Sequence, residues 1–218
     1  ADGAVSQNEI AYIDLNGTRL MSEVIKVVGN NAYVQVFEST RGLTVGTEVE
    51  FQGHMLEVVL GPGLLQRNLD GLENDLDKMD GIFLKRGDYT FPLDEEKLWH
   101  FQPIAQPGDK VTAGSWLGEV DENFQPHKIM VPFTMKGEYT VKSITQEGEY
   151  TIYKTIAVVE DSNGQSTELN MIQRWPVKMP LTAYKEKPRP SKLLETGVRS
   201  IDTLNPIVEG GTGFIPGA

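Results

Sequence analysis

Short apolar runs separated by turn residues cover the first 60 residues. The runs are rich in β-branched side chains, have Gly or Asn at most breaks, and occupy residues 9–14, 19–28, 32–37, 47–51 and 55–60. Such regular spacing predicts antiparallel strands in a small barrel or sandwich. We expect an antiparallel β-barrel over residues 1–60, with an exposed edge and a missing first strand, because the pattern is already under way at Ala1.

Turn residues mark two boundaries in this part of the chain. Asn16-Gly17-Thr18 satisfies the glycosylation triplet, but Asn-Gly readily adopts positive φ and is better interpreted as a hairpin turn. The run at residues 60–63, Leu-Gly-Pro-Gly, ends the last barrel strand. Residues 61–87 form a connecting segment, and apolar spacing over residues 64–79 predicts a short helix or two turns there.

The pattern returns to strands over residues 88–178. A G-D-x-V-x-x-G turn at residues 108–114 precedes the run 116–120, and residues 128–132 lead through Gly137 into the run 139–144. This arrangement is similar to the barrel-sandwich hybrid of lipoyl and biotinyl carrier domains. Further strands are expected within residues 151–160 and 167–172, around an Asp-Ser-Asn-Gly turn.

Residues 179–218 follow a different pattern. Prolines at positions 176, 180, 188 and 190 indicate an extended connector. Val198, Ile201 and Leu204 share one helical face in a segment that Pro206 stops, and residues 212–216 are expected to form a strand. The overall fold class is therefore mainly β, with a short α-helical portion near residue 200.

Composition narrows the possible partners. The formal net charge is -11 and Cys is absent, so a basic nucleic-acid footprint, direct membrane insertion and a disulfide framework are all disfavoured. No run approaches the ~20 apolar residues that a membrane-spanning helix needs. We expect a cytoplasmic location and no nucleic-acid partner.

Several titratable residues are better explained by structural roles than by catalysis or metal binding. Metal-ligand spacing is absent among His54, His100 and His127, which lie far apart in the sequence. The adjacent carboxylates Asp94-Glu95-Glu96 point in different directions, and the acidic run at residues 74–81 does not match the calcium-loop pattern. We expect no metal site, and a solvated helix end at residues 74–81. The three tryptophans are expected to fill cores, with an interface role open for one of them; they are Trp99, Trp116 and Trp175.

A carrier function would require a modified lysine on a tight hairpin. Lys128 leads directly into Met130-Val131-Pro132, which places it in the strand itself. The carrier fold is therefore expected without carrier chemistry.

The last 27 residues hold the most specific motif. Thr196-Gly197-x-Arg199-x-x-Asp202, continuing through Pro206 to Gly210-Gly211, resembles the segment before the phosphate-binding loop of rotary ATPases. Pro216 directly before Gly217 is similar to the catalytic A subunits of the vacuolar and archaeal-type branch. His127 to Pro132 and Gln173 to Val177 resemble segments of an insertion found in that subunit.

The resemblance implies that residues 179–218 are a linker and the start of an α/β P-loop nucleotide-binding domain. Gly217 and Ala218 would open a G-x-x-x-x-G-K-[ST] loop that binds ATP or ADP with Mg²⁺. The loop lysine, the threonine and the catalytic acid do not occur in the 218 residues, so we expect this chain neither to bind nor to hydrolyse ATP by itself.

The resemblance also implies partners. The barrel would join an alternating ring with B subunits, the insertion over residues 88–178 would face a peripheral stalk, and the complex would move protons or sodium ions from the cytoplasmic face of a membrane. One departure is Asn74-Asp75 where the family has arginine and proline, which indicates a divergent bacterial branch. An F-type or export-type ATPase subunit and a free-standing β-barrel or carrier module are the alternatives.

Overall fold

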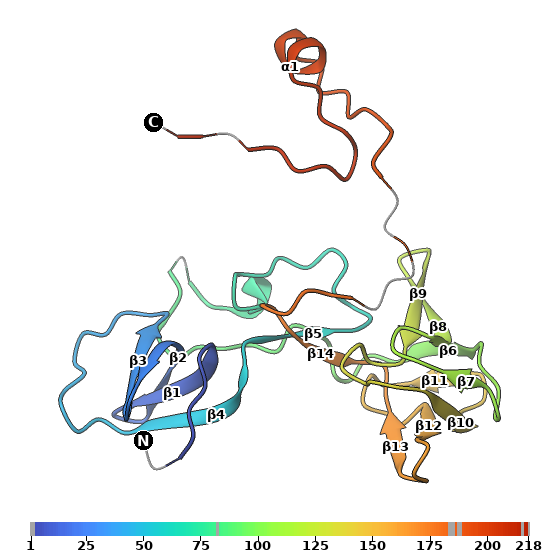
Figure 1. Ribbon diagram of the computed structural model, residues 1–218, viewed down its shortest axis with the longest axis horizontal. Helices are drawn as coiled ribbons and strands as arrows, with labels where there is room; N and C mark the ends of the chain where they lie inside the picture. Colours follow the sequence, from blue (N-terminus) through green and yellow to red (C-terminus); the bar gives the residue numbers. More distant parts are fainter. Residues whose placement is uncertain (1–2, 82, 183–185, 187–188, 215, 218) are drawn as a thin grey trace. The chain divides into compact units, whose positions relative to one another are not determined.

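The computed structural model describes residues 3–81, 83–182, 186, 189–214 and 216–217. The chain divides into two compact units, Ala1–Ala183 and Tyr184–Ala218, which are described separately below. Figure 1 shows strands dominating the first unit and one short helix in the second. This confirms the mainly β fold class.

The N-terminal strands form one antiparallel sheet in the order β3-β2-β1-β4. Their bounds are β1 Glu9–Leu15, β2 Thr18–Val28, β3 Asn31–Val36 and β4 Val49–Met55. Asn16 and Gly17 join β1 to β2 at φ 52° and 87°, which confirms the predicted hairpin turn. Alternating residues such as Ile13, Leu20 and Val24 are buried on one face, and this face forms the core side of the sheet.

The last expected barrel strand belongs elsewhere in the structure. The run 55–60 divides, because β4 ends at Met55 and β5 comprises Glu57–Leu60. β5 pairs only with β14, Gln173–Pro176, as an antiparallel ribbon in which Leu60 lies opposite Gln173. The assignment of this whole run to the barrel was therefore wrong. Lys178, which follows β14, lies 2.6 Å from the Glu23 carboxylate on β2.

The connecting segment contains turns and one 3-10 turn, Leu76–Lys78. Gln66 and Glu73 both adopt φ 66°, which breaks the helical register that the apolar spacing suggested. Asp75 is fully buried and its carboxylate lies 3.0 Å from the Arg67 guanidinium. The prediction of a solvated helix end was wrong at this residue, because the ion pair with Arg67 and the bond from its N–H to Thr90 allow its burial.

Two four-stranded sheets make up the barrel-sandwich region, in the orders β13-β12-β10-β7 and β11-β6-β8-β9. Their strands are β6 Trp99–Pro103, β7 Lys110–Val111, β8 Trp116–Glu122, β9 Gln125–Met130, β10 Tyr139–Ile144, β11 Gly148–Tyr150, β12 Ala157–Glu160 and β13 Ser166–Leu169. One core cluster surrounds Phe101 and another surrounds Leu117, and Ile144 packs against both. The expected strand at residues 151–160 begins only at Ala157, after a turn.

The tryptophans have three different environments. Trp99 is 4% exposed in the core, whereas Trp116 is 54% exposed, so the expectation of a core role was wrong for Trp116. Trp175 packs edge-on against Phe133 at a centroid distance of 5.8 Å. The exposure of Trp116 follows from a register shift between Trp116 and Gly118, which takes it out of the inward alternation of β8.

The second unit holds the helix α1, Arg199–Leu204, close to the predicted position. Leu193 and Val208 form an isolated antiparallel bridge that brings the two arms around this helix together. Residues 212–214 and 216 have no regular structure. The strand expected at 212–216 is thus wrong for its described residues.

Candidate functional site

The predicted nucleotide-loop residues lie at the end of the second unit. Gly217 is exposed and has no regular structure, and Ala218 lies outside the described residues. Of the two, then, only Gly217 can be placed, and its role as the first loop glycine stays a prediction.

The Thr196 to Asp202 motif forms a compact hydrogen-bonded turn before this end. The Asp202 carboxylate accepts hydrogen bonds from Thr196 Oγ1 at 2.6 Å, from the Thr196 N–H at 3.1 Å and from the Gly197 N–H at 3.0 Å. The Thr196 hydroxyl, followed by these N–H groups, lowers the pKa of Asp202. The role of Asp202 in this structure is therefore to hold the turn that leads into α1.

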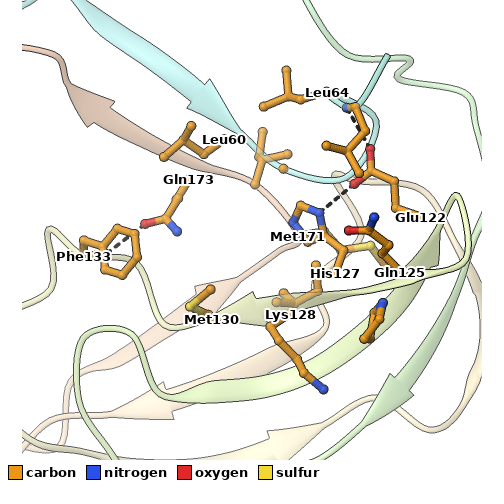
Figure 2. Close-up of a pocket in the computed structure, with 15 residues that line it drawn as sticks. Leu60, Leu64, Glu122, Gln125, His127, Lys128, Met130, Phe133, Met171 and Gln173 are labelled. Atoms are coloured by element: carbon orange, nitrogen blue, oxygen red, sulfur yellow. Dashed lines mark hydrogen bonds and ion pairs between the residues drawn. The ribbon is translucent and has the colours of Figure 1, made fainter. Parts of the chain in front are cut away.

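The first unit contains a pocket of about 470 Å³ where the connecting segment meets the barrel-sandwich region. Figure 2 shows Gln173 and Phe133 at one end of the pocket and His127 with Glu122 at the other. Its apolar wall comes from three separate chain segments and comprises Leu60, Leu64, Leu65, Ile129, Met130, Phe133, Met171 and Ile172. The pocket exists because β5 is paired with β14 next to β9.

Glu122 is the best-anchored polar residue of the pocket. Its side chain is 2% exposed, and Oε1 accepts hydrogen bonds from the N–H groups of Gly63 at 2.7 Å and Leu65 at 3.1 Å. Oε2 lies 2.7 Å from His127 Nδ1. Because one carboxylate accepts from two backbone groups and a ring, it fixes the connecting segment against the β8–β9 hairpin.

The ring of His127 has a defined orientation. Since the Glu122 carboxylate can only accept, Nδ1 carries a proton, and in the neutral tautomer of this ring Nε2 is left as a hydrogen-bond acceptor. At the opposite end, Gln173 Oε1 accepts a hydrogen bond from the Phe133 N–H at 2.9 Å, which leaves its amide N–H₂ as a donor.

Lys128 lies within β9, as predicted, and its ammonium group pairs with the Glu119 carboxylate. The same group lies 4.9 Å from the centre of the Trp116 ring. This position in a paired strand differs from the hairpin that a carrier lysine requires.

The three histidines have different hydrogen-bond partners. His100 is bracketed by two carboxylates, with Nε2 2.9 Å from Glu147 and Nδ1 2.9 Å from Glu149. His54 Nδ1 lies 2.8 Å from the Met55 carbonyl oxygen. In the described part of the chain, no three His, Asp or Glu side chains form a group that could hold a metal ion.

Sequence reasoning did not identify Glu122 as a functional residue. Alternation along β8 offered a signal, since Val120 and Glu122 share a face and Val120 is buried. A carboxylate on the inward face of a strand must find donors, and only the tertiary structure shows that these come from residues 63 and 65.

Two family models match most of the first unit. One is described as "ATP synthase alpha/beta family, beta-barrel domain" and covers residues 3–53, and the other, "ATPsynthase alpha/beta subunit barrel-sandwich domain", covers residues 90–178. The chain belongs to the ATP synthase alpha/beta family. The second match also agrees with the predicted barrel-sandwich fold of the insertion.

Curated proteins similar to this chain include several V-type ATP synthase alpha chains. That of Borrelia garinii subsp. bavariensis is 45% identical over 99% of this chain, and that of Treponema denticola is 44% identical over the same share. The V-type ATP synthase alpha chain 1 of Treponema pallidum is also 44% identical. These matches confirm the predicted kinship with the V-type branch.

The chain spans about 38% of the length of the curated relatives that it matches. Among its described residues, none of the helices has the length and apolar character that crossing a bilayer would require.

Proposed function

We propose that this chain is the non-catalytic N-terminal part of the A subunit of a V/A-type ATPase or ATP synthase. The observation that carries the proposal is the 45% identity to a V-type ATP synthase alpha chain over 99% of the chain. In the intact complex, the subunit couples ATP hydrolysis or synthesis to proton or sodium transport at the cytoplasmic face of a membrane. This part of it serves ring assembly and stator contact.

We assign no nucleotide site to the described residues. Gly217 is exposed, and α1 has only six residues. ATP, ADP and Mg²⁺ therefore fit the intact subunit through residues other than these, and we derive no chemical step from this chain.

Ring assembly is supported by exposed apolar side chains at the end of the β2–β3 hairpin, with Val27 on one face of the sheet and Val28 and Tyr33 on the other. Ile25, Val27 and Val28 on β2 and Tyr33 on β3 are all exposed. β3 is also an edge strand with one unpaired side in the described sheet. Exposed apolar side chains beside an open edge are typical of a protein interface, and we assign this surface to the neighbouring B subunit.

Stator contact is assigned to the barrel-sandwich region. The β8–β9 hairpin presents Phe124 with its side chain 98% exposed at the turn, and Trp116 is exposed on the same hairpin. Two exposed aromatic side chains on one hairpin suit a contact with another protein, for which the peripheral stalk is the proposed partner.

Photo-crosslinking in the assembled complex tests both assignments. A benzoylphenylalanine replacing Tyr33 should form adducts with the B subunit, and one replacing Phe124 should form adducts with a stalk subunit. The same probe at Val45, an exposed loop residue, serves as the control. Adducts from Val45 but none from Tyr33 to any ring subunit would remove the ring assignment, and the corresponding result for Phe124 would remove the stalk assignment.

Calorimetry tests the placement of the nucleotide loop. The 218-residue chain should release no heat of binding when titrated with Mg-ATP, because it offers too few phosphate donors. A micromolar affinity would contradict the assignment.

A further inference from the structure

The pocket between the connecting segment and β9 has no role in the proposed function. Its volume of about 470 Å³ lies within the usual range for small-molecule sites. Its wall is apolar, with a few polar groups at fixed positions, as ligand pockets generally are. These features indicate a binding site for a small molecule.

The apolar wall favours an aromatic ligand. Met130 and Met171 both line the pocket, and thioethers make favourable contacts with aromatic rings. Phe133 closes one end, where its ring is held by an edge contact to Trp175. Two flexible sulfur-containing side chains and one fixed ring suit a flat, one- or two-ring compound.

The charges around the pocket disfavour an anionic ligand. Glu119 is paired with Lys128, whereas Glu122 accepts hydrogen bonds from the His127 ring and from two backbone N–H groups. In the neutral form of His127 the charge of Glu122 is not offset, so these four side chains carry a net negative charge. An anionic ligand would lose its hydration in an apolar pocket without gaining a partner of opposite charge.

The polar atoms define which group fits. In the neutral imidazole whose Nδ1–H donates to Glu122, His127 Nε2 is an acceptor, and it lies at the end of the pocket opposite Phe133. A hydroxyl group donates one hydrogen bond and so satisfies this nitrogen, whereas an ether or a carboxylate has no proton to give. We propose that the pocket binds an aromatic alcohol, with its hydroxyl on His127 Nε2 and its ring between Met130 and Met171.

The test is a titration of the ¹⁵N-labelled 218-residue chain with 2-naphthol at neutral pH. We expect saturable chemical-shift changes at the amides of Leu65, Met130 and Gln173, which come from the three sides of the pocket. Two analogues with the same ring system serve as matched ligands. Loss of the hydroxyl hydrogen bond in 2-methoxynaphthalene should weaken binding at least about fivefold, and the anionic naphthalene-2-sulfonate should bind more weakly than 2-naphthol.

Three variants complete the test. Met130→Trp should block the pocket and abolish the shifts, whereas Leu98→Trp, at an exposed position outside the pocket, should leave them unchanged. His127→Phe should remove the preference for 2-naphthol over its methyl ether. The proposal would be overturned by the absence of saturable shifts at these amides, by equal binding of 2-naphthol and 2-methoxynaphthalene, or by tighter binding of the sulfonate. The ligand comparison needs no variant, so it decides the question even if a substitution prevents folding.

Discussion

Replacing Glu122 by alanine tests whether one buried carboxylate holds the connecting segment to the barrel-sandwich region. The side chain is 2% exposed and accepts three hydrogen bonds, from the Gly63 N–H, the Leu65 N–H and His127 Nδ1. The change leaves all three donors without this acceptor. The effect should therefore be much larger than that of a typical surface charge.

The magnitude follows from the exposure of each donor. Gly63 is only half-buried, so losing its partner costs about 1–2 kcal/mol, whereas Leu65 is exposed and its N–H can bond to water at a cost below about 1 kcal/mol. The loss of the His127 contact adds about 1 kcal/mol. We expect the free energy of unfolding to fall by about 3 kcal/mol.

Urea denaturation followed by tryptophan fluorescence measures this change, since Trp99 lies in the same core cluster as Val120 of β8. Glu119→Ala is the matched control on the same strand, because its pair with Lys128 is partly exposed and should be worth about 0–1 kcal/mol. Amide hydrogen exchange should also become faster at Gly63 and Leu65. Equal effects of the two substitutions, or unchanged exchange at Gly63, would refute the reasoning.

Three further predictions concern single residues. Gly118→Ala should destabilise the chain by about 3 kcal/mol or more in the same denaturation assay, because a Cβ would lie 2.3 Å from the Phe101 ring and 2.6 Å from the Gln102 carbonyl oxygen. Gly108→Ala is the control, because Gly108 has φ 97° and open space around it, and this change should lower the free energy of unfolding by only about 1 kcal/mol. A smaller loss of stability in Gly118→Ala than in this control would be inconsistent with close packing at Gly118. Burial raises the pKa of Tyr89 to about 12, so an ultraviolet titration should show this phenol ionising above the usual value of 10. The stability that the neutral phenol contributes is present below pH 10 and is lost as the pH rises through about 12. Tyr89→Phe should remove that part of the alkaline transition. Hydrogen bonds to Glu147, and next to Glu149, raise the pKa of His100. The stability that protonated His100 contributes is therefore complete below the ordinary pKa of 6.5 and is lost as the pH rises through the raised pKa. An NMR titration in which Glu147→Gln leaves the His100 midpoint unmoved would show that this carboxylate is not the cause.

Local pattern was sufficient for most of the strands and turns. Short β-branched apolar runs located β1, β2 and β3 within a residue or two, and Asn16-Gly17 specified its turn because few other dipeptides adopt positive φ at both positions. Glycine and proline at residues 60–63 correctly ended β5. These features depend on neighbouring residues in the chain, so a single sequence is enough to predict them.

The candidate site could not be predicted in the same way. No pattern within residues 57–60 shows that this strand pairs with residues 173–176, and the pocket exists only because of that pairing. The sequence did not identify Glu122 as a site residue, because its hydrogen-bond donors are the N–H groups of Gly63 and Leu65, far away in the sequence. Asp75 was expected in solvent for the same reason, since its burial depends on Arg67 and Thr90.

By itself, the sequence determined the β-rich fold class, the barrel-sandwich likeness of the insertion and the kinship with the V-type branch, because each is encoded in short contiguous patterns. The tertiary structure alone decided the partner of β5, the exposure of Trp116 and the burial of Glu122. The physical reason is that alternation along a strand tells which residues share a face, whereas the free energy of burying a polar or aromatic side chain depends on which distant segment covers that face.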